Sequence, residues 1–216
     1  MPLQNRVLPT GEIVAHLSKA GIFMGNRGIL HDEDRTLGKS RWKHTNWIIC
    51  ALEFRGGKRE LMSRGGYTEL FFLDEAVALA AGHRPCAECR RAAFLAYRDA
   101  FAGCSGSNTK APDIDKALHA ARVNSWSREQ ITFEAEIGHL PEGAMIHVNS
   151  EPWLLWSGRL LRYTPDGYDA VIERPMGAVT VLTPKPSVDV LRQGFEPVIH
   201  PSAHQVLAQS FTTRQR

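Results

Sequence analysis

Two cysteines three positions apart, Cys86 and Cys89, constrain this 216-residue chain more than any other feature. They lie in residues 82–91, which read Gly-His-Arg-Pro-Cys-Ala-Glu-Cys-Arg-Arg. Thiol groups at this spacing can share one soft metal ion or form one disulfide, and either bond would fix the local backbone. The surrounding arginines indicate that an anionic group lies nearby. The stretch therefore predicts a site with its own chemistry.

Composition limits the classes to which the chain can belong. Hydrophobic residues make up 43% and charged residues 23%, as in an ordinary globular protein of one large domain or two small ones. The net charge of +3 is too small for binding nucleic acid by overall charge, so anion binding must come from local clusters. Four unevenly spaced cysteines predict a reducing, cytoplasmic compartment. Without a signal sequence or a long apolar run, we expect no membrane partner.

Local patterns predict an α+β fold whose first part, residues 1–125, is helical and carries the cysteines. A strand at 47–54 is expected to form a β-hairpin with a returning strand at 59–62 across Gly56-Gly57. Helices are expected to begin at Asp74, as an N-cap, and at Pro85 and Pro112, since proline suits a first helical turn.

The second part, residues 126–216, has a different pattern of apolar and polar residues. Short alternating apolar segments follow one another from Ile131 to Leu182, separated by turn signals. They predict a β-rich meander that closes into a small barrel or sandwich, followed by a short helix at 188–193. The two parts either fold separately or share one core.

Residues 72–90 resemble the last part of the metal-binding domain of the Ada family, which are alkyl-DNA repair and response proteins. In that domain a short helix ends in Gly, one residue follows, and then Arg-Pro-Cys, two residues and Cys; Gly82 to Cys89 repeats this order. The resemblance implies a zinc ion held by four cysteines, one of which accepts a methyl group from a DNA phosphotriester. Cys86 and Cys89 match the second cysteine pair, whereas the first pair, and with it the expected methyl acceptor, is missing.

The residues themselves suggest how a metal site would be completed. Zinc requires four nitrogen or sulfur ligands in a tetrahedron. Cys86 and Cys89 supply two, Cys50 is the candidate third, and His44 is preferred to His83 as the fourth. Two alternatives stay open: Cys50 as a small buried apolar residue, and a redox-active Cys-x-x-Cys pair, although this pair lacks the preceding strand of thioredoxin-like proteins.

A basic and aromatic segment provides candidate contacts to nucleic acid. Residues 39–64 are rich in lysine, arginine and tryptophan, and such side chains pair with phosphates and stack on unpaired bases. The alternative is a solvated hairpin with its tryptophans in the core. The candidate nucleic-acid-binding residues are Arg41, Trp42, Lys43, Arg59, Arg84, Arg90 and Arg91.

A second polar group near the N-terminus is the candidate catalytic site. Asn26 and Arg27 lie between two glycines, and His31 and Asp32 follow closely. A histidine and a carboxylate can perform acid–base chemistry, although a surface turn with polar side chains and no catalytic role would have the same composition.

Together these features favour a zinc-containing nucleic-acid-binding protein, with DNA as its partner and a role in DNA repair or processing. One alternative is an enzyme that acts on nucleic acid or a phosphorylated small molecule through Asn26, Arg27, His31 and Asp32. The other is a protein-interaction module with a structural metal. The sequence does not decide whether the chain is an enzyme.

Overall fold

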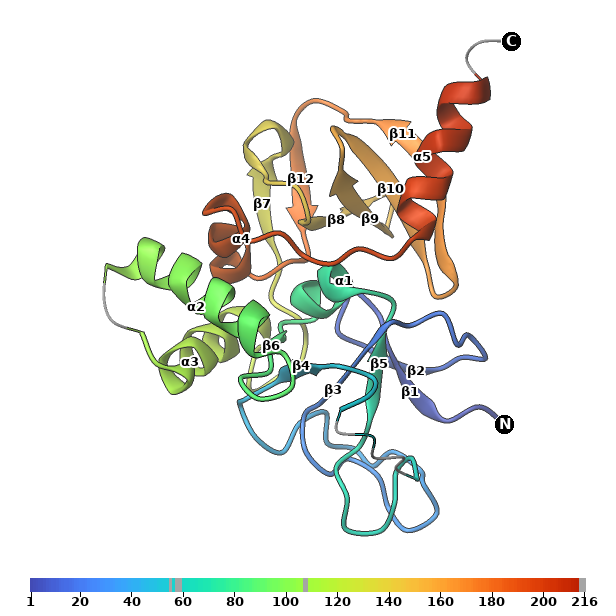
Figure 1. The fold of residues 1–216 in the computed structure, drawn as a ribbon, viewed down its shortest axis with the longest axis vertical. Coiled ribbons are helices and arrows are strands. Elements are labelled where there is room, and N and C mark those ends of the chain that lie inside the picture. Colours follow the sequence, from blue (N-terminus) through green and yellow to red (C-terminus); the bar gives the residue numbers. More distant parts are fainter. Residues whose placement is uncertain (55, 57–59, 107–108, 214–216) are drawn as a thin grey trace.

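The computed structural model describes residues 1–54, 56, 60–106 and 109–213 (Figure 1). Two six-stranded sheets form its framework, and helices lie between and beside them. The first sheet comes wholly from residues before 86 and the second wholly from residues after 132. Neither sheet closes on itself, because the strands at the two ends of each order do not pair.

The N-terminal part is strand-rich, so the expected helical part, and with it the predicted fold class, is wrong. The first sheet has the order β2 (Ile13–Ala15), β1 (Gln4–Val7), β5 (Leu70–Phe72), β3 (Phe23–Asn26), β4 (Ile48–Cys50), β6 (Arg84–Pro85). Its strands contain only two to four residues, and apart from the local pair β1–β2 their partners lie far along the chain. Local periodicity cannot reveal such pairings, since each strand is too short to show a pattern.

The predicted hairpin is also replaced by long-range pairing. Strand β4 pairs antiparallel with β3 and parallel with β6, instead of with the segment that follows it. Residues 60–62 form no strand, and Arg59 lies outside the described residues. Strand β4 therefore lies inside the sheet, between β3 and the edge strand β6.

Three helices follow β5. Asp74 caps α1 (Glu75–Ala80) as predicted, and Gly82 has the left-handed φ of +82° expected after the helix end. Helix α2 (Arg91–Ser105) begins six residues later than predicted, because Pro85 lies in β6. Helix α3 (Ala111–Arg122) begins next to the predicted Pro112. Helix α1 contacts both β5 and β8 and lies between the two sheets (Figure 1).

The second sheet confirms the predicted meander, but it does not close into the predicted barrel. Its order is β11 (Gly167–Glu173), β10 (Arg159–Thr164), β9 (Glu151–Trp156), β8 (Met145–Val148), β12 (Ala178–Val181), β7 (Phe133–Glu136). Strands β8 to β11 pair antiparallel in succession, and then β12 returns to pair with β8 and β7. That return leaves β7 and β11 at opposite edges, so the sheet stays open. The remaining elements are η1 (Ile137–His139), α4 (Lys185–Arg192) and α5 (Ser202–Thr213).

Buried side chains from both sheets belong to one hydrophobic cluster. Asp74 adds a polar link, because it accepts hydrogen bonds from the Tyr168 hydroxyl (2.9 Å) and the His200 N–H (3.1 Å). The boundary near residue 125 stays a prediction. Among the described residues, no helix has the length and apolar character needed to cross a membrane.

Candidate metal centre

Strand pairing brings the Cys86–Cys89 loop to Cys50. Cys50 is the last residue of β4, and the parallel neighbour β6 runs directly into Cys86. The Cys86 N–H donates a hydrogen bond to the Ile49 carbonyl (2.9 Å), which extends the pairing by one residue. Two cysteines 36 positions apart in the sequence therefore lie side by side at the ends of neighbouring strands.

A tight turn before α2 brings Cys89 back toward Cys86. The Arg90 N–H donates to the Cys86 carbonyl (3.3 Å), and the Glu88 N–H lies 3.4 Å from the Cys86 sulfur as a donor. Backbone donors of this kind stabilise a thiolate. The loop is therefore shaped to present both sulfur atoms on one side.

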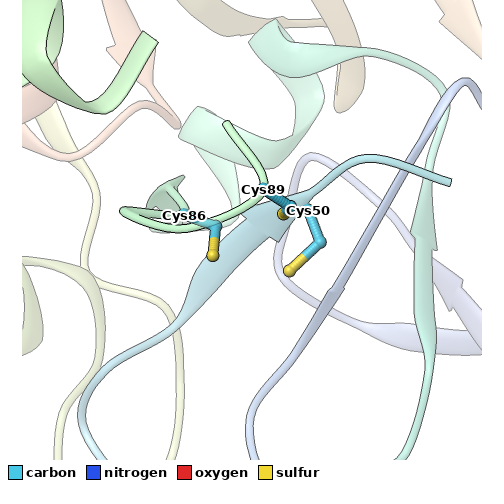
Figure 2. Close-up of side chains that lie close together, drawn as sticks. All are labelled: Cys50, Cys86 and Cys89. Atoms are coloured by element: carbon cyan, nitrogen blue, oxygen red, sulfur yellow. The ribbon is translucent and has the colours of Figure 1, made fainter. Parts of the chain in front are cut away.

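The three sulfur atoms lie within 4.8 Å of one another, and none forms a disulfide (Figure 2). Cys50 and Cys86 are buried and Cys89 is partly exposed. Zinc–sulfur bonds of about 2.3 Å in a tetrahedron separate the sulfurs by roughly 3.8 Å, so small side-chain movements suffice to bind one ion. The cluster can hold a metal ion, and Cys50 takes the place of the third ligand that the sequence suggested.

The thiols have unequal proton affinities. A hydrogen bond with the Cys50 thiol lowers the pKa of Cys86 to about 5, against the opposing effect of burial. The same hydrogen bond, together with burial, raises the pKa of Cys50, and burial raises the pKa of Cys89. Of the three thiols in the cluster without metal, Cys86 therefore loses its proton most readily. An incoming cation must displace the remaining protons.

The cluster forms one wall of a cavity of about 410 Å³. Met24 lies directly opposite both Cys50 and Phe71 in the sheet, and residues paired in this way share a face. These side chains line the cavity together with Asn26 and the buried Glu69. The Glu69 carboxylate accepts a hydrogen bond from the Met62 N–H (2.7 Å). A metal on the three sulfurs would thus have its fourth position next to a cavity with polar groups.

The structure does not bring His44 to the cluster. Among the described residues, no histidine or carboxylate joins the three sulfurs within 4.8 Å. A Cβ at Gly28 would lie 3.3 Å from the His44 ring, which places this ring beside the loop after β3. His83, the other candidate, is fully buried between the rings of Trp47 and Phe72, with centroid distances of 5.3 and 4.7 Å.

The candidate catalytic group of Asn26, Arg27, His31 and Asp32 does not converge on one point. Asn26 lines the cysteine cavity, whereas Arg27 lines a different one. The His31 ring contacts the Thr68 hydroxyl (2.7 Å) and the Ser63 carbonyl (3.3 Å). Asp32 accepts hydrogen bonds from the backbone of Asp34 and Thr36, as in a surface turn with polar side chains.

Two of the candidate nucleic-acid contacts are already paired with carboxylates. Arg84 forms a buried bidentate pair with Asp115 (2.9 and 2.8 Å), and the partly buried Arg90 forms a pair with the buried Glu75 (2.5 Å). Sequence reasoning missed both carboxylates. Glu75 lies in the first turn of α1, where an acidic side chain commonly complements the helix dipole, and Asp115 is 31 positions from its partner.

The other candidate contacts remain accessible. Lys43 and Arg91 are exposed, and Arg41 and Trp42 are partly exposed. Arg41 and Trp42 also line the cavity that contains Arg27. The structure therefore separates the predicted cationic patch into buried ion pairs and a smaller accessible group.

Comparison with protein-family models, with curated proteins and with solved structures finds no match to this chain.

Proposed function

We propose that this chain is a zinc protein that binds nucleic acid, with DNA as the expected partner and repair or processing as its role. The observation that carries the proposal is the cluster of three sulfurs at the wall of a cavity. Thiolates prefer soft ions, and zinc is the common metal of a site with three or four cysteines. The similarity of residues 72–90 to the Ada family supports the same ion.

The open side of the cluster favours a functional metal over a structural one. Structural zinc sites are closed by four protein ligands, whereas zinc sites that bind a reactant keep one position free. The three sulfurs face a cavity that also contains Asn26 and Glu69. A zinc ion bound there would polarise a group that enters the cavity. This geometry argues against the module with a purely structural metal.

The nucleic-acid partner is supported by the Ada-like segment and by the accessible residues Arg41, Trp42, Lys43 and Arg91. Basic side chains that reach solvent can pair with phosphates, and an indole can stack on a base. Arg84 and Arg90 contribute indirectly, because their ion pairs hold the segments that flank the cysteine loop. The alternative enzyme built on His31 and Asp32 loses its main support, because the His31 ring is bonded to Thr68 and Ser63 and the Asp32 carboxylate holds a turn.

Metal analysis of purified protein tests the metal centre. We expect one zinc ion per chain in the wild type and its loss in Cys50→Ser, Cys86→Ser and Cys89→Ser. Cys104→Ser is the matched control, because Cys104 is an exposed free cysteine outside the cluster. A metal-free, stable wild type, or zinc retained in all three cluster variants, would contradict the proposal.

Fluorescence anisotropy with labelled single-stranded and duplex DNA tests the partner. Affinity should fall steeply as salt rises, because phosphate contacts release counterions. Lys43→Ala and Arg91→Ala should weaken binding, whereas Arg162→Ala, which removes an arginine from the second sheet, should not. Affinity that does not change between low and moderate salt would exclude binding dominated by phosphates.

A further inference from the structure

A second cavity, of about 370 Å³, contains an unusual concentration of arginine. Among the described residues that line it are four arginines and two tryptophans, namely Arg27, Arg41, Arg122, Arg128, Trp42 and Trp47. None of the three cysteines lines it. Its chemistry is therefore separate from that of the metal centre.

Arg27 is a buried cation with an unused donor. Its side chain is 2% exposed, and its guanidinium lies 3.9 Å from the centre of the Trp47 ring. Nε donates to His83 Nε2 (3.3 Å) and Nη1 donates to the Gly11 carbonyl (3.0 Å), whereas the buried Nη2 has no hydrogen-bond partner. A Cβ at Gly11, which also lines the cavity, would lie 4.0 Å from Nη2. This donor therefore lies next to a glycine of the cavity wall.

Arg122 places a second buried guanidinium over the same ring. It is 1% exposed, and its guanidinium lies 3.7 Å from the centre of the Trp47 ring. Nη1 donates to the Gly82 carbonyl (2.7 Å), Nη2 contacts the Thr45 carbonyl (2.6 Å), and the buried Nε has no hydrogen-bond partner. Each of these two arginines therefore has a buried nitrogen without an acceptor.

In the part of the chain that the structure describes, no carboxylate forms a direct ion pair with either cation. Asp115 acts on Arg122 at longer range, but both of its oxygens are already bonded to Arg84. Both bond to backbone carbonyls and histidine rings, unlike Arg84 and Arg90, which bond to carboxylates. Burying a charge without a counter-charge is strongly unfavourable. An anion that enters the cavity would relieve this imbalance.

The entrance of the cavity adds two arginines and two carboxylates, so the excess positive charge comes from the two buried arginines. The guanidinium of Arg41 donates a hydrogen bond to the Gly38 carbonyl, and that of Arg128 donates to the Lys39 carbonyl. Glu12 and Glu129 also line the cavity, but both are exposed and neither bonds to a lining arginine. Four arginines against two carboxylates leave a net positive cavity.

We propose that this cavity binds the phosphate group of a nucleotide, with Arg27 and Arg122 as the buried anion ligands. The planar fork of a guanidinium matches phosphate oxygens. Trp42 is partly exposed, with its ring centre 5.8 Å from that of Trp47, and offers a surface on which a base can stack. The volume lies near the lower end of the roughly 300–1,000 Å³ of small-molecule sites, which suits one nucleotide.

Isothermal titration calorimetry of the full-length protein tests the proposal, with inorganic phosphate, a nucleoside 5′-monophosphate and the matching nucleoside as probes. We expect the monophosphate to bind at least about tenfold more tightly than the nucleoside, because the nucleoside has no phosphate to pair with the buried arginines. Arg41→Ala and Arg128→Ala alter the entrance and leave the buried arginines in place, so they should fold and weaken binding. Arg27→Lys keeps the charge but loses the fork and should weaken binding further. Arg162→Ala is the control, since Arg162 lies in the second sheet and does not line the cavity.

Two DNA oligonucleotides, one with and one without a 5′-phosphate, identify the source of the phosphate. Equal affinity for the mononucleotide and the phosphorylated strand indicates a free nucleotide, and much tighter binding of the phosphorylated strand indicates a strand end. The proposal is overturned if folded wild type binds neither phosphate nor the monophosphate at millimolar concentration. It is also overturned if the nucleoside binds equally well, or if the entrance variants bind like wild type. Zinc content is a separate readout, so this proposal and the metal centre can fail independently.

Discussion

Replacing Asp74 by asparagine should change how the stability of the protein depends on pH. The Asp74 side chain is fully buried between the two sheets and accepts hydrogen bonds from the Val77 N–H (3.0 Å), the Tyr168 hydroxyl (2.9 Å) and the His200 N–H (3.1 Å). Burial raises the pKa of Asp74 to about 6 from the ordinary 3.8, because the loss of hydration outweighs these hydrogen bonds.

The sign and size of the effect follow from this shift. A carboxyl whose pKa is higher in the folded state binds a proton more tightly there, so its stabilising contribution is complete below pH 3.8 and is lost as pH rises through about 6. The difference between the two pKa values corresponds to about 3 kcal/mol, most of it lost between about pH 4 and pH 7. Asparagine does not titrate in this range. The free energy of unfolding of Asp74→Asn should therefore improve relative to wild type as pH rises.

Urea unfolding followed by tryptophan fluorescence measures this difference at each pH. The variant has its own offset, because an amide cannot accept all three hydrogen bonds, so the change with pH is the relevant quantity. Asp99→Asn, which removes an exposed carboxylate from α2, controls for the general effect of losing a negative charge. A difference between Asp74→Asn and wild type that stays constant from pH 4 to pH 8, or that moves in favour of wild type, would refute the reasoning.

Three further predictions concern the residues around the metal centre. Asp115→Ala leaves Arg84 as an uncompensated buried charge and should cost roughly 3–5 kcal/mol in urea unfolding, whereas Arg84→Met combined with Asp115→Leu should recover most of it. Gly82→Ala should lower the melting temperature by several degrees in calorimetry, since φ is +82° and the new Cβ would lie 2.4 Å from an arginine side-chain carbon. Zinc affinity, measured by competition with a chelator, should rise from pH 6 to pH 8, because the raised pKa values of Cys50 and Cys89 make bound protons compete with the metal. Equal affinity at both pH values would contradict the last prediction.

The features that local sequence predicts are those that depend on neighbouring residues. Asp74 caps α1, and Gly82 adopts the left-handed conformation after it, because both roles depend only on the adjacent backbone. The grouping of Cys50 with Cys86 and Cys89 was predicted from chemistry, since three thiols are a natural ligand set.

The features that the sequence did not predict depend on contacts between distant segments. Strands of two to four residues are too short to show an alternation of apolar and polar residues that would identify a partner. The pairing of β4 with β3 and β6 could therefore not be predicted from the sequence. The same limit explains the misplaced helix start at Pro85, because the proline ends a short strand whose partner lies 36 positions earlier. His44 precedes β4 in the sequence, but its ring lies beside Gly28 and not beside the sulfurs.

The neighbouring residues Asn26 and Arg27 show how one sheet serves two cavities. Asn26 ends β3 on the face that carries Met24 and, across the sheet, Cys50. Arg27 is the next residue, and successive side chains of an extended chain point in opposite directions, so its guanidinium reaches the ring of Trp47 instead. Trp47 in turn precedes β4, and its carbonyl accepts a hydrogen bond from the Arg84 N–H (3.1 Å) two residues before Cys86. Because side chains alternate along β3 and β4, one set lines the cavity at the cysteine cluster and the other set lines the arginine-rich cavity. Asn26 and Arg27 therefore face different cavities, and this is why the candidate catalytic group does not converge on one point.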